Sequence, residues 1–206
     1  MKLLFATHNN HKLLEMSALL LPHVLSLPSQ NGIDFSFEEN GTTFCENALG
    51  KAMHLYQLSG QSSLADDSGI AVDYLNGEPG IYSARYGQQK GSPQLSDSER
   101  NAYLLKQMEN VPLANRSARF ICSIALVLSP SRIFVVQESL EGHLAFEPAG
   151  DEGFGYDPIF VVGSEQKTMA LLGQEVKNSI SHRALAAKRM LSIIDSIEQE
   201  KITYVC

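Results

Sequence analysis

The segment Gly153-Phe154-Gly155-Tyr156-Asp157-Pro158 combines residue types that recognise a planar ring. Glycine lets the backbone approach a ligand closely, and a proline biases the residue before it toward an extended conformation. Phe154 would then offer a flat face to a ring, while Asp157 would accept hydrogen bonds from the edge of that ring. The segment alone is equally consistent with a tight loop whose aromatic side chains fill the core. Its interpretation therefore depends on the other polar segments of the chain.

The segment Thr7-His8-Asn9-Asn10-His11-Lys12 has the character of a phosphate site. It lies where an apolar stretch gives way to a helical pattern, and the start of a helix presents free backbone N–H groups to an anion. A cation there is unfavourable by about 0.3–1 kcal/mol unless an anion is bound. The last expected helix repeats the arrangement, with His182 and Arg183 directly after Ser181. Lys177 lies a few residues upstream, so two helix starts favour one anionic ligand, although an ordinary capped helix also fits the first segment.

Two acidic pairs supply the oxygen ligands that a hard cation prefers. Asp66 and Asp67 follow a short apolar strand and precede Ser68-Gly69, where we expect a glycine turn, and Glu38-Glu39 forms a second pair upstream. Adjacent like charges cost energy unless a cation or a shared proton relieves them. Mg²⁺ takes carboxylate oxygens together with substrate phosphates. The sequence therefore predicts Mg²⁺ as the cofactor, and a solvated turn is the alternative.

The composition is that of a folded protein that does not bind duplex nucleic acid. Of 206 residues, 44% are apolar and 19% charged, enough for one large domain or two closely packed lobes. The net charge of −7 argues against nucleic acid as a partner, and no apolar run reaches the roughly 18 residues of a membrane span. The cysteines Cys45, Cys122 and Cys206 are widely spaced, so we expect reduced thiols and a cytoplasmic location.

The common nucleotide-site motifs are absent from the chain. No Gly-x-x-x-x-Gly-Lys-Ser/Thr loop is present, which argues against a P-loop enzyme, and no Gly-x-Gly-x-x-Gly follows the first strand. A Gly-x-Ser-x-Gly elbow, the mark of many serine hydrolases, is also missing. From the residues alone, the chain is a phosphate-ligand α/β protein with hydrolytic chemistry.

The hydrophobic pattern predicts the elements that position these segments. Strands are expected over residues 2–6, 63–65, 70–72, 119–128, 132–141 and 158–162. Helices are expected from about 9 to 21, 43 to 60, 96 to 109 and from Ser181 onward. Strand–helix units beside a hairpin indicate an α/β fold with a mixed sheet flanked by helices.

The ordered motifs resemble the inosine/xanthosine triphosphate pyrophosphatases, which hydrolyse non-standard purine nucleoside triphosphates. The matching segments are Thr7-x-Asn9-x-x-Lys12, Thr42-Thr43-Phe44-x-Glu46-Asn47-Ala48, Ala65-Asp66-Asp67-Ser68-Gly69, Gly80-Ile81-Tyr82-Ser83-Ala84-Arg85-Tyr86, Glu147-Pro148-Ala149-Gly150, residues 153–158 and Ser181-His182-Arg183. The resemblance covers nearly the whole chain and implies a single domain over residues 1–206, with an elongated mixed sheet in two lobes and a central cleft. It also implies a homodimer that cleaves ITP, dITP and XTP to the monophosphate and pyrophosphate with Mg²⁺.

The resemblance assigns roles by position. It implies that residues 7–12 and Lys177 bind the triphosphate and that Ser68 contacts the substrate. Asp67 would accept the proton and bind Mg²⁺, which Glu38, rather than Glu39, would share. The residues that would bind the base are Phe154, Gly155, Tyr156, Asp157, His182 and Arg183. Asp66 remains an alternative to Asp67. The departures are His8, where the family often has glycine, and His11, whose bulk lies beside the expected phosphates.

Base choice follows from hydrogen-bond polarity. Hypoxanthine and xanthine carry an acceptor oxygen at C6, which His182 and Arg183 would meet with donors, whereas adenine carries an amino group there. A site built on such pairing rejects the wrong ligand by about 10⁴–10⁵-fold. Two alternatives remain at this point: a Maf-like pyrophosphatase acting on modified nucleotides, and a nucleotide-binding module without catalysis. The latter would not need Asp67 and Glu38.

Overall fold

A computed structural model gives the fold of residues 1–89 and 91–203. Its centre is one sheet of seven strands in the order β2-β1-β3-β4-β5-β6-β7. The strands are β1 (Lys2–Phe5), β2 (Val24–Ser26), β3 (Ser63–Val72), β4 (Ser117–Ser129), β5 (Arg132–Leu144), β6 (Phe160–Val162) and β7 (Lys167–Thr168). β1 pairs in parallel with β2 and β3, whereas β6 pairs antiparallel with β5 and β7. The predicted mixed sheet is therefore confirmed.

Along the described residues, three helices alternate with the first strands, and two more follow β7. They are α1 (Asn10–Leu19), α2 (Phe44–Ser59), α3 (Asp97–Gln107), α4 (Gln174–Ile180) and α5 (His182–Thr203). Short 3₁₀ turns cover Ser29–Asn31, Asp73–Leu75, Gly80–Arg85, Leu113–Asn115, Asp157–Ile159 and Met169–Leu171. No helix in the part of the chain that the structure describes is both long enough and apolar enough to cross a membrane. The predicted thiol Cys206 lies outside the described residues.

The described chain divides into two units, each made from separate segments. Unit 1 consists of Met1–Asp67, Cys122–Glu138 and the segment from Arg183 onward, and unit 2 consists of Ser68–Ile121 and Ser139–His182. The prediction of one domain over the whole chain stays a prediction, as does the predicted cleft.

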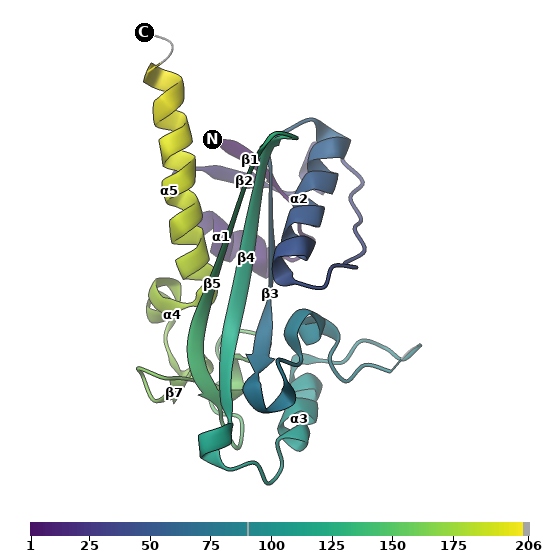
Figure 1. Ribbon diagram of the computed structural model, residues 1–206, viewed down its shortest axis with the longest axis vertical. Coiled ribbons are helices and arrows are strands. Elements are labelled where there is room, and N and C mark those ends of the chain that lie inside the picture. Colours follow the sequence, from purple (N-terminus) through teal and green to yellow (C-terminus); the bar gives the residue numbers. More distant parts are fainter. Residues whose placement is uncertain (90, 204–206) are drawn as a thin grey trace. The chain divides into compact units, whose positions relative to one another are not determined.

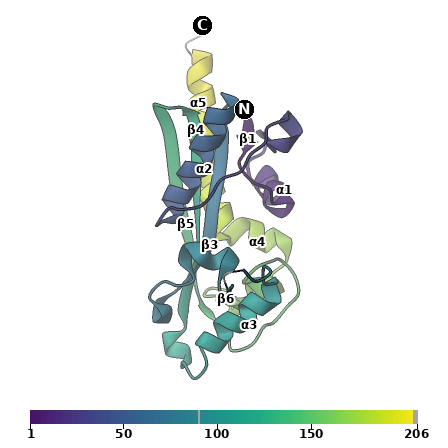
Figure 2. The same cartoon turned by 90° about the vertical axis from the view of Figure 1, so that its right-hand side faces the viewer.

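Unit 1 has three layers, which follow from the alternation of side chains along its strands. Leu3 and Phe5 of β1 pack with α1 and α5, whereas Leu4 and Ala6 pack with α2 on the other face. In β3 the same alternation sends Leu64 to the α1–α5 face and Ala65 to the α2 face. Figures 1 and 2 show α2 on one side of the upper strands and α5 on the other.

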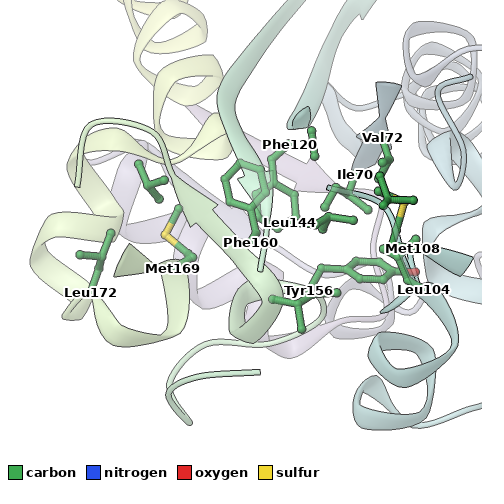
Figure 3. Close-up of a cluster of buried hydrophobic side chains, with 14 residues drawn as sticks. Ile70, Val72, Leu104, Met108, Phe120, Leu144, Tyr156, Phe160, Met169 and Leu172 are labelled. Atoms are coloured by element: carbon green, nitrogen blue, oxygen red, sulfur yellow. The ribbon is translucent and has the colours of Figure 1, made fainter. Parts of the chain in front are cut away.

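Unit 2 packs α3 and the connecting turns around its own apolar cluster. Leu104 of α3 and Met108, directly after the end of α3, meet Ile70, Leu144 and Tyr156 in this cluster, which Figure 3 shows. α3 begins with a capping box, in which Ser96 and Glu99 bond each other's backbone N–H groups. This cap fixes the first turn of α3, and that turn lies against the 153–158 segment.

One prediction about the acids is wrong. Residues 63–72 form a single strand, β3, rather than two short strands around a turn at Asp66 to Gly69. Each buried carboxylate has cations or donors on its own face of β3, so the strand does not need to break there. Gly69 serves close packing instead, because a Cβ there would collide with the hydroxyl of Ser83.

Smaller differences concern the ends of elements. The strand expected from Pro158 begins at Phe160, because residues 157–159 form a 3₁₀ turn. The short strands β2 and β7 and the helix α4 were not predicted, since three or fewer residues per strand carry little periodicity. The hairpin is confirmed: β4 and β5 are neighbours joined by two residues.

Candidate active site

Asp66 and Asp67 lie on opposite faces of β3. Successive side chains of a strand point to opposite sides, and Leu64 and Ala65 already assign the two faces of this strand. Asp66 therefore lies on the side of α1 and α5, and Asp67 on the side of α2. Both residues are buried, with 1% and 6% of their surface exposed. Two adjacent acids thus have different environments.

Asp66 is held by two cations. Its Oδ2 lies 2.9 Å from Nζ of Lys12 and 3.6 Å from Nε of Arg183. Arg183 also pairs with Glu15, whose Oε2 lies 2.6 Å from its Nη1. Burial by itself would raise the pKa of Asp66, but the cations of Lys12 and Arg183 outweigh it and hold the pKa well below the usual range. Asp66 therefore stays ionised at neutral pH.

Asp67 is held more weakly and has the opposite shift. Its Oδ2 accepts a hydrogen bond from Nδ2 of Asn47 at 3.1 Å, and its Oδ1 lies 3.5 Å from Nζ of Lys51. Burial raises the pKa of Asp67, and the attraction of Lys51 only partly compensates. A carboxylate with a raised pKa, next to an acid that stays ionised, is suited to accept a proton.

Lys51 links Asp67 to Glu39. Its Nζ lies 2.6 Å from Oε1 of Glu39, which is half-buried, whereas the neighbouring Glu38 is exposed. Burial would lower the pKa of Lys51, but the charges of Asp67 and other nearby acids outweigh it and raise the pKa. Glu39, rather than Glu38, is thus the upstream acid that this cluster contains. The assignment of a metal to Glu38 stays a prediction.

The helix start at residues 7–12 is capped by its own asparagine. Asn9 Oδ1 accepts hydrogen bonds from the N–H groups of His11 at 2.8 Å and Lys12 at 3.2 Å. Asn9 in turn donates its N–H to the hydroxyl of Thr7 at 3.1 Å. An anion at this helix start would compete with Asn9 for these donors. The ligand-binding role of residues 7–12 stays a prediction.

A cavity of about 470 Å³ in unit 1 joins these groups. Polar residues from the 7–12 segment, the upstream acids, α2 and β3 share its wall: Thr7, His8, Asn9, Lys12, Ser36, Glu39, Lys51 and Asp66. Phe35 and Phe37 form its apolar side, and the ring of Phe35 lies 5.8 Å from that of His8. The wall thus carries two ammonium groups and two carboxylates among neutral hydrogen-bonding groups, so it offers donors to phosphate and oxygen ligands to a cation.

The 153–158 segment forms a second cluster, in unit 2. Asp157 Oδ2 accepts hydrogen bonds from the N–H of Phe154 at 2.9 Å and from Nζ of Lys177 at 2.7 Å. Nζ of Lys177 also lies 4.6 Å from the centre of the Phe154 ring. The structure therefore places Lys177 with the aromatic segment.

The remaining predicted residues of unit 2 are buried or partly buried. His182 begins α5 and stacks on Phe120, with ring centres 4.8 Å apart and an angle of 18°. The hydroxyl of Tyr156 donates to the carbonyl of Ser83 at 2.8 Å, which directs Tyr156 into the core. Ser68 is half-buried at the start of the unit 2 part of β3.

Sequence reasoning missed three members of the unit 1 cluster: Glu15, Asn47 and Lys51. Asn47 and Lys51 are four residues apart in α2 and therefore share one face of that helix. A lysine and an asparagine at the buried positions of a mainly apolar helix face are a signal that the sequence does contain. Glu15 offered no such signal, because its partner Arg183 lies 168 positions away.

The donor set fits a divalent cation. Asp67 and Glu39 supply two carboxylates on either side of one ammonium, and Mg²⁺ is usually bound by one or two carboxylates together with substrate phosphates. Within the described residues, no group of three or more His, Cys, Asp or Glu side chains could hold a metal ion, so the two carboxylates would need substrate phosphates to complete the coordination.

Comparisons with known proteins agree over nearly the whole chain. The Ham1 family model matches residues 3–193. A dITP/XTP pyrophosphatase of Treponema denticola is 47% identical over 186 residues, which cover 90% of this chain and 94% of that protein. One of Bacillus licheniformis is 42% identical over 197 residues, with 94% and 98% covered. The solved structure of a HAM1 protein from Coxiella burnetii has a TM-score of 0.86 at 38% identity and covers 95% of this chain and 99% of its own. The chain belongs to the Ham1 family.

Proposed function

We propose that this protein hydrolyses ITP, dITP and XTP to the nucleoside monophosphate and pyrophosphate. The relatives from Treponema denticola and Bacillus licheniformis carry the name dITP/XTP pyrophosphatase. The observation that carries the proposal is the placement of Asp66 and Asp67 on opposite faces of β3, where the two carboxylates meet different partners. It provides one acid that stays ionised beside Lys12 and one proton acceptor on the α2 side of the strand.

Asp67 is the proposed proton acceptor. Its raised pKa makes the carboxylate a stronger base than an ordinary aspartate. Asn47 fixes the orientation of the carboxylate by donating to Oδ2. In the proposed reaction, Asp67 takes a proton from the water that attacks the α-phosphorus, and the bond from this phosphorus to the bridging oxygen breaks to release pyrophosphate.

Mg²⁺ is the proposed cofactor, held by Asp67 and Glu39. When bound, it would neutralise charge on the phosphate oxygens and on the leaving pyrophosphate. Nζ of Lys51 lies 2.6 Å from Glu39 and 3.5 Å from Asp67, so its ammonium holds both carboxylates near one point.

Lys12 is the proposed phosphate ligand in unit 1. A lysine ammonium has three N–H donors, and the structure shows one of them bonded to Asp66. Asp66 therefore orients Lys12 at the wall of the 470 Å³ cavity and leaves donors for a phosphate. Thr7 and Asn9 line the same wall.

The purine ring is assigned to the cluster of unit 2. Phe154 offers a ring face, and Lys177 and His182 offer donors to the C6 oxygen of hypoxanthine or xanthine. Arg183 differs from this expectation: it is 2% exposed and engaged with Asp66 and Glu15. We therefore assign Arg183 chiefly to holding Asp66 in unit 1.

A homodimer and a cytoplasmic location complete the proposal. Both rest on the resemblance in sequence, and the location also on the expectation of reduced thiols. Light scattering on the purified protein tests the dimer, because a particle mass near the 22.6 kDa of one chain would contradict it.

Pyrophosphate release from ITP, XTP, GTP and ATP, with Mg²⁺ and with EDTA, tests the function. We expect metal-dependent turnover of ITP and XTP and little from ATP. Asp67→Asn removes the proton acceptor at almost constant shape, and we expect its kcat to fall by about 10²–10⁴-fold. Equal turnover of all four nucleotides would contradict the assignment of base recognition to the unit 2 cluster. Binding of ITP without turnover would indicate a sensor.

A further inference from the structure

Helix α3 holds both backbone polar groups of Gly155, its N–H and its carbonyl. The carboxylate of Asp97 accepts the N–H of Gly155, with 2.6 Å between Oδ2 and the nitrogen. The amide of Asn101 donates to the carbonyl of Gly155, with 3.0 Å between Nδ2 and the oxygen. Asp97 and Asn101 are four residues apart in α3 and so share one face of the helix. Together they clamp Gly155 from one side.

The two side chains of the clamp are anchored in α3. Asp97 is the first residue of α3, directly after the Ser96 cap, where a negative charge is favoured by the helix dipole. Asn101 is buried, with 4% of its surface exposed, so its side chain is confined to one position. The clamp therefore transmits the position of α3 to the segment that it holds.

The held segment needs this support. Gly155 has a φ of +63° and Gly153 a φ of +84°, so two residues that flank Phe154 have the widest conformational freedom of any residue type. A cavity of about 430 Å³ lies beside the segment, lined by Asp97, Asn101 and residues 150 and 151 among others. Packing alone therefore does not fix the backbone on this side.

The neighbouring attachments hold other parts of the segment. Tyr156 is tied to the carbonyl of Ser83, and Asp157 is tied to Lys177. Neither bond involves the peptide groups of Gly155, which lies between Phe154 and Tyr156. The direction of the Phe154 ring thus depends on two supports: Asp157, which accepts the N–H of Phe154, and the clamp, which holds the next residue.

We propose that Asp97 and Asn101 are positioning residues that set purine discrimination through the backbone of Gly155. This inference rests on the proposed function, because it takes the 153–158 segment as the part that recognises the base. It assigns no contact with the substrate to either residue.

The test compares Asp97→Ala with two matched variants. Asp97→Asn keeps an acceptor oxygen for the Gly155 N–H but loses the charge. Arg100→Gln removes the ion pair between Arg100 and Asp97 and leaves the clamp in place. Each variant is assayed for kcat and KM with ITP and ATP and Mg²⁺, for ITP affinity by calorimetry in EDTA, and for thermal stability.

For Asp97→Ala we expect KM for ITP to rise about tenfold while kcat changes little, since one charge-assisted hydrogen bond is lost. The ratio of kcat/KM for ITP over ATP falls by a similar factor. Asp97→Asn restores most of both values, and Arg100→Gln resembles the wild type. Asn101→Ser, which shortens the other side of the clamp, is expected to lower the same ratio.

Two results would overturn the inference. One is a lowered melting temperature in Asp97→Ala with an unchanged KM and ITP-to-ATP ratio, since that pattern marks a structural role only. The other is equal loss in Asp97→Ala and Asp97→Asn. Failure of the proposed function would give a different result: the wild-type protein itself would not release pyrophosphate from ITP. In that case the calorimetric affinities decide the role of the clamp.

Discussion

Asp66 and Asp67 are neighbours in β3, and their pKa values are displaced in opposite directions. The cause is the alternation of a strand, which places Asp66 with Lys12 and Arg183 and directs Asp67 toward α2. Sequence adjacency thus produces two acids with different protonation behaviour, which is how one site can hold both a fixed charge and a base.

The two isosteric amide substitutions should change stability in opposite directions in metal-free protein at pH 7. Asp66→Asn lowers the free energy of unfolding by about 3–5 kcal/mol, because a buried ion pair is broken. Asp67→Asn raises it, because a buried charge with incomplete compensation is replaced by a neutral group. Urea denaturation in EDTA measures both, and a loss of stability in Asp67→Asn would contradict the assignment.

The loss of stability at acid pH follows from the same two pKa shifts. A carboxyl whose pKa is lowered on folding contributes stability above its ordinary pKa of 3.8 and loses it as the pH falls toward the folded value. Asp67, whose pKa is raised, has the opposite sign: its contribution is present below pH 3.8 and is lost as the pH rises through the raised value. The wild type should therefore lose stability below about pH 4 more steeply than Asp66→Asn. Equal slopes for the two proteins would exclude Asp66 as a major acid-labile group.

Much of the fold was predictable, because its signals are local. The strand at residues 2–5, the helix that follows it and the capping box of α3 all depend on residues within a few positions of one another. The course of β3 was not predictable in this way. The sequence predicted a turn at Gly69, but the small size of this residue allows close contact with Ser83, fourteen residues later.

The partners of the acids were the least predictable part of the site. Asp66 pairs with Lys12 and Arg183, which lie 54 and 117 positions away in the sequence, and no local pattern records such pairs. The choice of Glu39 over Glu38 likewise depends on which side chain reaches Lys51. In a segment without regular structure, periodicity does not decide which of two adjacent acids points inward.

Substitutions of Glu39 and of its neighbour Glu38 test which of the two acids binds Mg²⁺. We expect Glu39→Gln to raise the Mg²⁺ concentration at half-maximal activity by about tenfold or more, because one of two carboxylate ligands is lost. Glu38→Gln should leave this concentration unchanged, since its side chain is exposed. A titration of pyrophosphate release against Mg²⁺ measures both, and the reverse order would restore Glu38 as the ligand.

Arg183 is expected to contribute more to stability than to base choice. Arg183→Ala leaves Glu15 and Asp66 buried without their shared cation and should cost about 3–5 kcal/mol. Thermal unfolding measures the loss. The ITP-to-ATP ratio of kcat/KM, measured at a temperature where the variant is folded, separates the two roles. A large fall in that ratio with full stability would return Arg183 to the base site.

Lys12 and Lys177 should differ in the part of the substrate that they bind. Lys12 lines the unit 1 cavity with Asp66, whereas Lys177 contacts Asp157 and Phe154 in unit 2. Inorganic tripolyphosphate carries the phosphates without a base, so it serves as a probe of the phosphate site alone. We expect it to inhibit ITP hydrolysis by the wild type competitively, Lys12→Met to weaken that inhibition by about tenfold or more, and Lys177→Met to leave it unchanged while raising KM for ITP. If Lys177→Met weakened tripolyphosphate inhibition as strongly as Lys12→Met does, Lys177 would belong to the triphosphate, as the family resemblance implies.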